Sequence, residues 1–112
     1  MIHLTSQSRI QLAIKPQDFR KQIDGLVAVT RQKLARDPRS GALFVFINRS
    51  RTMIRILSYQ GDGYWIATKR LTKGRFEGWP TSGSICEVSA KHLSTLIKGI
   101  ISSDLVSLDK ID

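Results

Sequence analysis

The pattern of hydrophobic and polar residues predicts a sheet in the middle of the chain, between Gly41 and Phe76. Three runs rich in β-branched and aromatic residues are separated there by two turn signals, which predicts a three-stranded antiparallel meander over residues 42–71. A shorter alternating run at residues 9–14 and an apolar run at 85–88 predict further strands. We therefore expect a mainly antiparallel sheet of about four to five strands.

The second turn of the meander, at residues 60–63, allows two tight registers. A tip at the last two of these residues would place Arg55 directly opposite Arg70, and like charges in that position are destabilising. A tip at Gly61-Asp62 places Arg55 opposite Thr68 instead. We therefore predict the Gly61-Asp62 register.

The first turn of the meander is expected at Arg49-Ser50, which places Val45 opposite Ile54. Since successive side chains of a strand point to opposite faces, these pairings define two faces of the sheet. The expected core face is apolar apart from Lys69 and consists of Leu43, Val45, Ile47, Ile54, Ile56, Trp65, Ala67 and Leu71. The other face is aromatic and basic and consists of Phe44, Phe46, Arg51, Met53, Arg55, Leu57, Tyr59, Tyr64, Ile66 and Arg70.

Helical periodicity occurs on both sides of the sheet segment. Apolar residues recur at helical spacing after Pro16, which suits a first helical turn, so a long helix is predicted over residues 16–35. Ser89 is a suitable N-cap before a second apolar stripe, which predicts a shorter helix over residues 89–100. These helices are expected to pack against the sheet.

A length of 112 residues suits one compact domain, because such a chain can bury a core without disulfide or metal staples. We predict an α+β fold with a single domain over residues 1–101 and a tail over 102–112 whose order the pattern leaves open. One cysteine, Cys86, excludes an internal disulfide and a cysteine-rich metal site. Without a signal-peptide run or an apolar segment of about 18 residues, the protein is expected to be cytoplasmic.

Positive charge is concentrated in the first part of the chain. The sequence has 18 Lys and Arg against 9 Asp and Glu, a net charge of +9. Residues 1–80 carry 15 basic and 5 acidic side chains, a balance of +10, whereas residues 81–112 carry 3 and 4, a balance of −1. A localised positive field favours polyanions, most often nucleic acid, although a basic surface can also serve solubility alone.

Two sets of residues are candidates for contact with nucleic acid. Rings among arginines on the mixed face suit the stacking of unpaired bases, unless a helix covers that face and leaves the arginines at its rim. The turn around Gly74 carries a second basic cluster, which suits a phosphate backbone or is simply solvated. The candidate phosphate contacts are Arg49, Arg51, Arg55, Lys69, Arg70, Lys73 and Arg75, and the candidate stacking or partner contacts are Phe44, Phe46, Tyr59, Tyr64 and Trp79.

Patterns of catalytic or metal-binding residues are weak. His3 and His92 have no acidic or metal-ligating partner near them in the sequence, and the acids are scattered through predicted caps and turns. The chain has neither a GxxxxGKS/T phosphate loop nor a dinucleotide glycine pattern. We therefore predict no catalytic residue, no metal site and no cofactor. A small metal-dependent nuclease would require DNA cleavage that a chelator stops.

Several segments, in one order along the chain, resemble a known family. They are DFRKQIDGL at residues 18–26, DPRSGALFVFINR at 37–49, KRLTKGRF at 69–76, and Trp79-Pro80. Over roughly residues 9–101 the chain resembles the TnpB accessory proteins, the Orf2-like second-frame proteins of the IS sixty-six group of bacterial insertion sequences. The resemblance implies a role in transposition beside a separate, larger transposase that performs the DNA chemistry. It also implies transposon-end DNA and that transposase as partners, and a location at the nucleoid when the protein is bound to DNA.

Two functions are consistent with these features. The first is a non-catalytic accessory protein of transposition that binds nucleic acid through its basic surface. The second is a protein-interaction module that binds the transposase or another accessory subunit through its aromatic residues, because aromatic and arginine side chains also anchor protein interfaces. Neither function makes the protein an enzyme.

Overall fold

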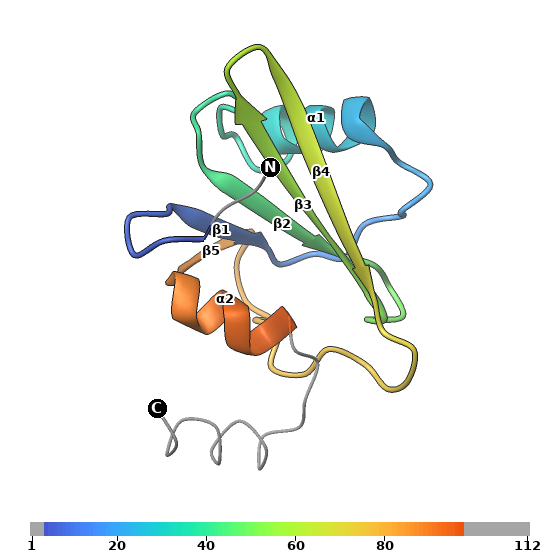
Figure 1. Ribbon diagram of the computed structural model, residues 1–112. Helices are drawn as coiled ribbons and strands as arrows, with labels where there is room; N and C mark the ends of the chain where they lie inside the picture. The colour runs from blue at the N-terminus through green and yellow to red at the C-terminus, as the bar shows by residue number, and fades with distance from the viewer. Residues whose placement is uncertain (1–3, 98–112) are drawn as a thin grey trace.

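The computed structural model describes residues 4–97, which form five strands and two helices. The elements are β1 (Ile10–Ala13), α1 (Ile23–Gln32), β2 (Leu43–Ile47), β3 (Met53–Gln60), β4 (Gly63–Arg70), β5 (Ile85–Val88) and α2 (Ala90–Ile97). The strands build one sheet in the order β4-β3-β2-β1-β5 (Figure 1). The sheet is mostly antiparallel, as expected, but β1 and β2 at its centre are parallel, which the sequence pattern did not indicate.

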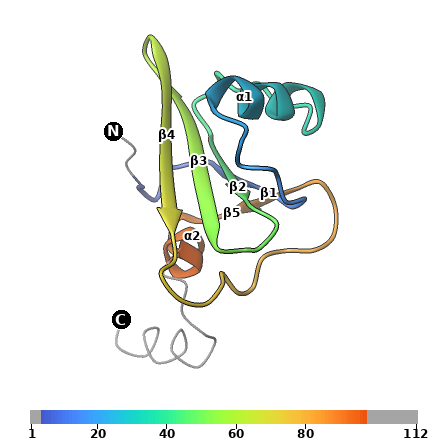
Figure 2. The same cartoon turned by 90° about the vertical axis from the view of Figure 1, so that its right-hand side faces the viewer.

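Both faces of the sheet are covered, one by α1 and the other by α2 with the loop after β4 (Figures 1 and 2). The α1 side buries Ala13, Leu26, Val29, Leu34, Ala42, Phe44, Phe46 and Leu57. The α2 side buries Ile10, Leu12, Leu43, Val45, Ile47, Ile54, Ile56, Phe76, Trp79, Leu93 and Leu96. The aromatic face that the sequence offered as a binding platform is therefore a second core beneath a helix.

Helix α1 is shorter than the helix predicted over residues 16–35. In the segment before it, the carbonyls of Phe19 and Lys21 accept hydrogen bonds from the guanidinium of Arg55, at 2.8 and 2.6 Å. These contacts tie the segment before α1 to β3, and the helix begins only after that segment, at Ile23. After the helix, Ala35 has a φ of 52°, in the left-handed region, and the chain turns away.

The turn between β2 and β3 is longer than the predicted two-residue tip. The backbone N–H of Asn48 donates to the carbonyl of Met53 at 3.1 Å. The side-chain Oδ1 of Asn48 accepts from the N–H groups of Thr52 and Met53, at 3.0 and 3.1 Å. As a result Val45 pairs with Ile56 and not with the predicted partner two residues earlier. A shift of two residues leaves each side chain on its predicted face, because the side-chain period of a strand is two.

The predicted register of the β3–β4 hairpin is confirmed. Arg55 lies opposite Thr68, and Tyr59 lies opposite Tyr64. Gly61 has a φ of 65°, which glycine adopts without the steric cost that other residues meet in a tight hairpin turn.

Strand β4 departs from the predicted core face. Trp65 and Ala67 were expected in the core, but both are exposed, and Trp65 retains 49% of its accessible surface. The buried cluster on the α2 side draws its strand residues from β1, β2 and β3. Because β4 is the outermost strand, its α2-side residues extend beyond this cluster.

Helix α2 begins with the predicted cap, because the hydroxyl of Ser89 accepts the backbone N–H of His92 at 3.1 Å. The helix is described as far as Ile97, so the last positions of the predicted helix and the tail at 102–112 lie outside the described residues. Within residues 4–97, no helix is both long enough and apolar enough to cross a membrane.

Candidate functional site

Two loops meet at the end of the sheet where β2 and β4 finish (Figure 1). The N–H of Leu71, just after β4, donates to the carbonyl of Thr52 in the β2–β3 loop at 2.9 Å. Further along, the N–H of Phe76 donates to the carbonyl of Arg51 at 2.7 Å, and the Phe76 ring is buried in the core. The two loops therefore form one connected surface.

Each of the two loops contains a residue whose backbone is in the left-handed conformation. Gly74 has a φ of 78°, so the turn that it makes after β4 needs glycine. Arg51 has a φ of 61°, a conformation that costs a residue with a side chain about 1–2 kcal/mol. Hydrogen bonds from both sides hold Arg51 there, since its N–H donates to Asn48 at 3.1 Å and its carbonyl accepts from Phe76.

Six of the seven predicted phosphate contacts lie on these two loops or on the last residues of β4. We call this set the basic end, and it consists of Arg49, Arg51, Lys69, Arg70, Lys73 and Arg75. Five of the six side chains are exposed, and Arg51 is half-buried. Among the residues that the structure describes, none of the six forms an ion pair. Because unpaired like charges repel one another, a bound anion would lower the electrostatic energy of this surface.

Arg55, the seventh predicted contact, is held within the fold. Its Nη1 donates to the Phe19 and Lys21 carbonyls, and its Nε donates to Thr68 Oγ1 at 3.3 Å. Its guanidinium carbon also lies 4.8 Å from the centre of the Phe19 ring, within cation–π range. Arg55 therefore anchors the segment before α1, and its role as a phosphate contact stays a prediction.

Three of the predicted aromatic contacts lie inside the protein. Phe44 and Phe46 are 1% and 0% exposed beneath α1. Trp79 is 5% exposed, and its indole Nε1 donates to the carbonyl of Ala13 at 3.1 Å. A buried ring offers no face to a base or a partner, so these three residues are removed from the candidate contacts.

The other two aromatic candidates pack against each other near the tip of the β3–β4 hairpin. Tyr59 and Tyr64 are half-buried, with ring centres 5.0 Å apart and ring planes at 67°. The guanidinium carbon of Arg39 lies 5.2 Å from the Tyr59 ring centre. The Tyr59–Tyr64 pair thus lies at the opposite end of β4 from Arg70 and its basic loop.

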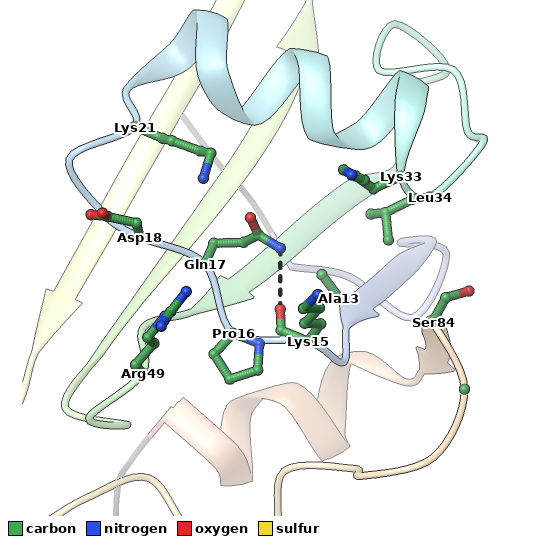
Figure 3. Close-up of a pocket in the computed structure, with 11 residues that line it drawn as sticks. Ala13, Lys15, Pro16, Gln17, Asp18, Lys21, Lys33, Leu34, Arg49 and Ser84 are labelled. Carbon is green, nitrogen blue, oxygen red and sulfur yellow. Dashed lines mark hydrogen bonds between the residues drawn. The ribbon is translucent and has the colours of Figure 1, made fainter.

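The fold also gathers basic residues that the sequence reasoning did not connect. A pocket of about 410 Å³ lies between α1 and the segment that joins β1 to α1 (Figure 3). Lys15, Lys21, Lys33 and Arg49 line it, and Asp18 is the acid among its lining residues. Because Arg49 also belongs to the basic end, the pocket extends the positive surface towards α1. No motif links these lysines, so only the three-dimensional fold brings them together.

Asp18 is paired with Arg20 and does not neutralise the neighbouring lysines. The Arg20 Nε and Nη2 groups donate to Oδ2 of Asp18 at 2.9 and 2.6 Å, and the Arg20 backbone N–H donates to Oδ1 at 2.9 Å. These hydrogen bonds lower the pKa of Asp18 to about 2, so this carboxylate is ionised at neutral pH. The ion pair is neutral as a unit, which leaves the pocket positive.

Residues 4–97 contain no group of three or more His, Cys, Asp or Glu side chains placed to hold a metal ion. His92 is exposed on α2, and Cys86 is half-buried on β5 against the core. The exposed guanidinium and ammonium groups of the basic end can donate hydrogen bonds to anions.

Comparisons with known proteins agree with the resemblance in the sequence. The family model described as IS66 Orf2 like protein matches residues 8–106. Uncharacterized protein y4jC of Sinorhizobium fredii is 34% identical over 92 residues, which cover 82% of this chain and 79% of that protein. Uncharacterized protein y4hO of the same organism is 34% identical over 93 residues, which cover 82% of this chain and 80% of that protein. No solved structure matches the chain significantly.

Proposed function

Because the chain belongs to the IS66 Orf2 like family of insertion-sequence associated accessory proteins, we propose that it binds nucleic acid through the basic end during transposition. Its partners in this proposal are DNA at the transposon ends and the transposase of the same element. That transposase performs the DNA chemistry, and this chain contributes no catalytic residue. The observation that carries the proposal is the meeting of six cations on the end of β4 and on two loops that backbone hydrogen bonds join.

The composition of the β2–β3 loop, of β4 and of the loop after it favours a ligand over simple solvation. Residues 48–52 and 63–76 contain no Asp or Glu. A surface that serves solubility usually mixes charges of both signs, because a single-sign field attracts polyanions. The charge distribution of the basic end therefore supports the proposed contact with phosphates.

The side chains of the basic end suit a phosphate backbone. Each arginine offers a planar guanidinium that can donate to two phosphate oxygens, whereas Lys69 and Lys73 act as point charges on flexible stems. Such contacts release counterions from the nucleic acid and supply affinity without reading a base sequence. The pocket lysines next to Arg49 provide a continuation of the same field.

The test is the affinity of the wild-type protein for labelled transposon-end DNA, measured by fluorescence anisotropy between about 50 and 200 mM salt. If all six cations contact phosphates, the logarithm of the binding constant falls with log salt at a slope of about −5. That slope corresponds to a loss of about a thousandfold over this range. An absence of binding at the lowest salt, or a slope near zero, contradicts the proposal.

The alternative function is a module that binds the transposase through aromatic anchors. Most of these aromatic residues are buried in the core. Phe44, Phe46 and Trp79 are buried, and an interface anchor must reach its partner. Co-purification of the two proteins from nuclease-treated extract separates the functions. A contact that survives the treatment is direct, whereas a contact that disappears was bridged by nucleic acid.

A further inference from the structure

Trp65 is the exposed large hydrophobic residue among those that the structure describes. It lies on β4, the edge strand of the sheet, with 49% of its surface accessible. A single exposed apolar side chain is common in soluble proteins and needs no explanation by itself. The residues around Trp65 indicate a role for the ring in binding.

The residues next to Trp65 on its face of the sheet are uncharged as far as Lys69. Ala67 and Lys69 share its face of β4, because alternate residues of a strand point the same way. The cross-strand partner of Trp65 is Ser58, and that of Ala67 is Ile56, both of which are buried. Small or apolar neighbours leave the ring accessible, and Lys69 follows about 13 Å along the strand.

From this arrangement we propose that Trp65 stacks on a base of a single-stranded nucleic acid whose backbone runs along β4 towards the basic end. This inference rests on the proposed function and names its ligand class. Proteins that bind single strands combine an exposed aromatic ring with a line of cations, because an unpaired base presents a face on which a ring can stack. A duplex hides those faces inside its base stack, so it would contact the basic end without engaging Trp65.

Charge favours a nucleic acid over a protein as the occupant of this surface. Lys69, Arg70, Lys73 and Arg75 follow Trp65 in the chain with no acid among them. A polyanionic strand satisfies all of these cations together with the ring. A protein partner anchored on Trp65, or a second copy of this positively charged chain, is an alternative that the experiment identifies.

The experiment uses tryptophan fluorescence, because the chain has two tryptophans in opposite environments. Trp65 is exposed, whereas Trp79 is buried, so a ligand that quenches the exposed emission reports on Trp65. Wild-type protein is titrated at low salt with a 20-nucleotide oligothymidine and with a 20-base-pair duplex, while anisotropy of the labelled DNA reports binding. Trp65→Phe, in which only the buried Trp79 emits, gives the matched background.

We expect the single strand to quench the Trp65 emission and the duplex to leave it unchanged while still binding. Trp65→Ala should weaken binding of the single strand about 5- to 150-fold, the range for loss of one stacked base, and change duplex binding less than about twofold. Trp65→Phe should restore most of the single-strand affinity, since it keeps a ring. Unchanged Trp79 emission in Trp65→Ala shows that this variant is folded.

Two results would overturn the inference and leave the proposed function standing. One is binding of both DNAs without quenching of Trp65 and with equal affinities for wild type and Trp65→Ala. The other is a change in Trp65 emission on adding transposase, or on raising the protein concentration, with no change on adding the single strand. If neither DNA binds at low salt, the proposed function itself fails, and this inference fails with it.

Discussion

Replacing Arg55 with alanine should destabilise the protein and leave its affinity for DNA nearly unchanged. The guanidinium of Arg55 donates to two backbone carbonyls, at 2.8 and 2.6 Å, and lies over the ring of Phe19. A hydrogen bond from a charged group contributes about 1.5–3 kcal/mol, and an exposed cation–π contact about 0.5–1 kcal/mol. The Lys21 carbonyl is near solvent and can be rehydrated, so we expect a total loss of about 2–3 kcal/mol.

The assay combines thermal unfolding with anisotropy of bound DNA. For a chain of this size, a loss of about 2–3 kcal/mol lowers the Tm by about 8–12 °C. Arg55→Lys keeps the charge and loses the double hydrogen bond, so it should recover only part of the stability. Arg70→Ala is the matched control, because Arg70 is exposed at the basic end. It should change stability by less than about 0.5 kcal/mol and reduce the salt slope of DNA binding by about 1.

Two results would refute this assignment of Arg55. The first is wild-type stability of Arg55→Ala, which would mean that the two carbonyl contacts contribute nothing measurable. The second is a loss of DNA affinity in Arg55→Ala equal to that in Arg70→Ala, measured below the Tm of both variants. In that case Arg55 would be a phosphate contact after all.

Three further predictions concern the parts of the fold that support this surface. Asn48→Ala removes the acceptor of two backbone N–H groups in the β2–β3 loop, and should lower the free energy of unfolding in urea by about 1–2 kcal/mol; an unchanged midpoint contradicts this. Trp79→Phe leaves the buried Ala13 carbonyl without its donor and should cost about 2 kcal/mol in the same assay, whereas a cost near zero contradicts it. The Asp18 carboxyl should titrate near pH 2 by NMR, and Arg20→Ala should return its pKa towards 3.8. Because this pKa is lowered on folding, the stabilisation is present above about pH 4 and is lost between about pH 4 and pH 2; a midpoint near 4 in the wild type contradicts this.

Local rules of strand pairing were sufficient for one hairpin and not for the other. The β3–β4 register followed from the avoidance of Arg55 opposite Arg70, an effect that the sequence of the two strands contains. The β2–β3 register did not follow from the strand sequences, because the Asn48 side chain accepts hydrogen bonds from the loop amides in a longer turn. A pairing rule based on the length of the turn does not include such a side-chain contact.

Tertiary contacts account for the error in α1. Apolar spacing indicates which residues can share a helix face, and α1 does bury Leu26 and Val29 against the sheet. The segment before the helix is bound instead by Arg55, which is more than thirty residues away and donates to its carbonyls. No local signal shows that contact.

The sequence predicted which charged side chains of the candidate site are exposed, but not which aromatic rings are. Runs of basic residues around turns stay exposed because ionised side chains are rarely buried without a partner, so the basic end follows from composition and turns. Whether a ring is exposed depends on which helix covers which strand. Phe44 and Phe46 lie beneath α1, whereas Trp65 lies on an edge strand beyond the α2-side core. The strand period alone predicted the opposite: Trp65 in the core, and Phe44 and Phe46 on the face that offers contacts.

The measurement that tests the central claim most directly compares two triple variants of equal net charge. Arg70, Lys73 and Arg75 are replaced by alanine in one, and the exposed Arg9, Arg31 and Lys91, which lie outside the basic end, in the other. If the basic end binds the phosphate backbone, the first variant loses about 2.7 of the salt slope for transposon-end DNA, and the second loses less than about 1. Equal losses in the two variants would contradict the account, because binding would then follow net charge and not this surface.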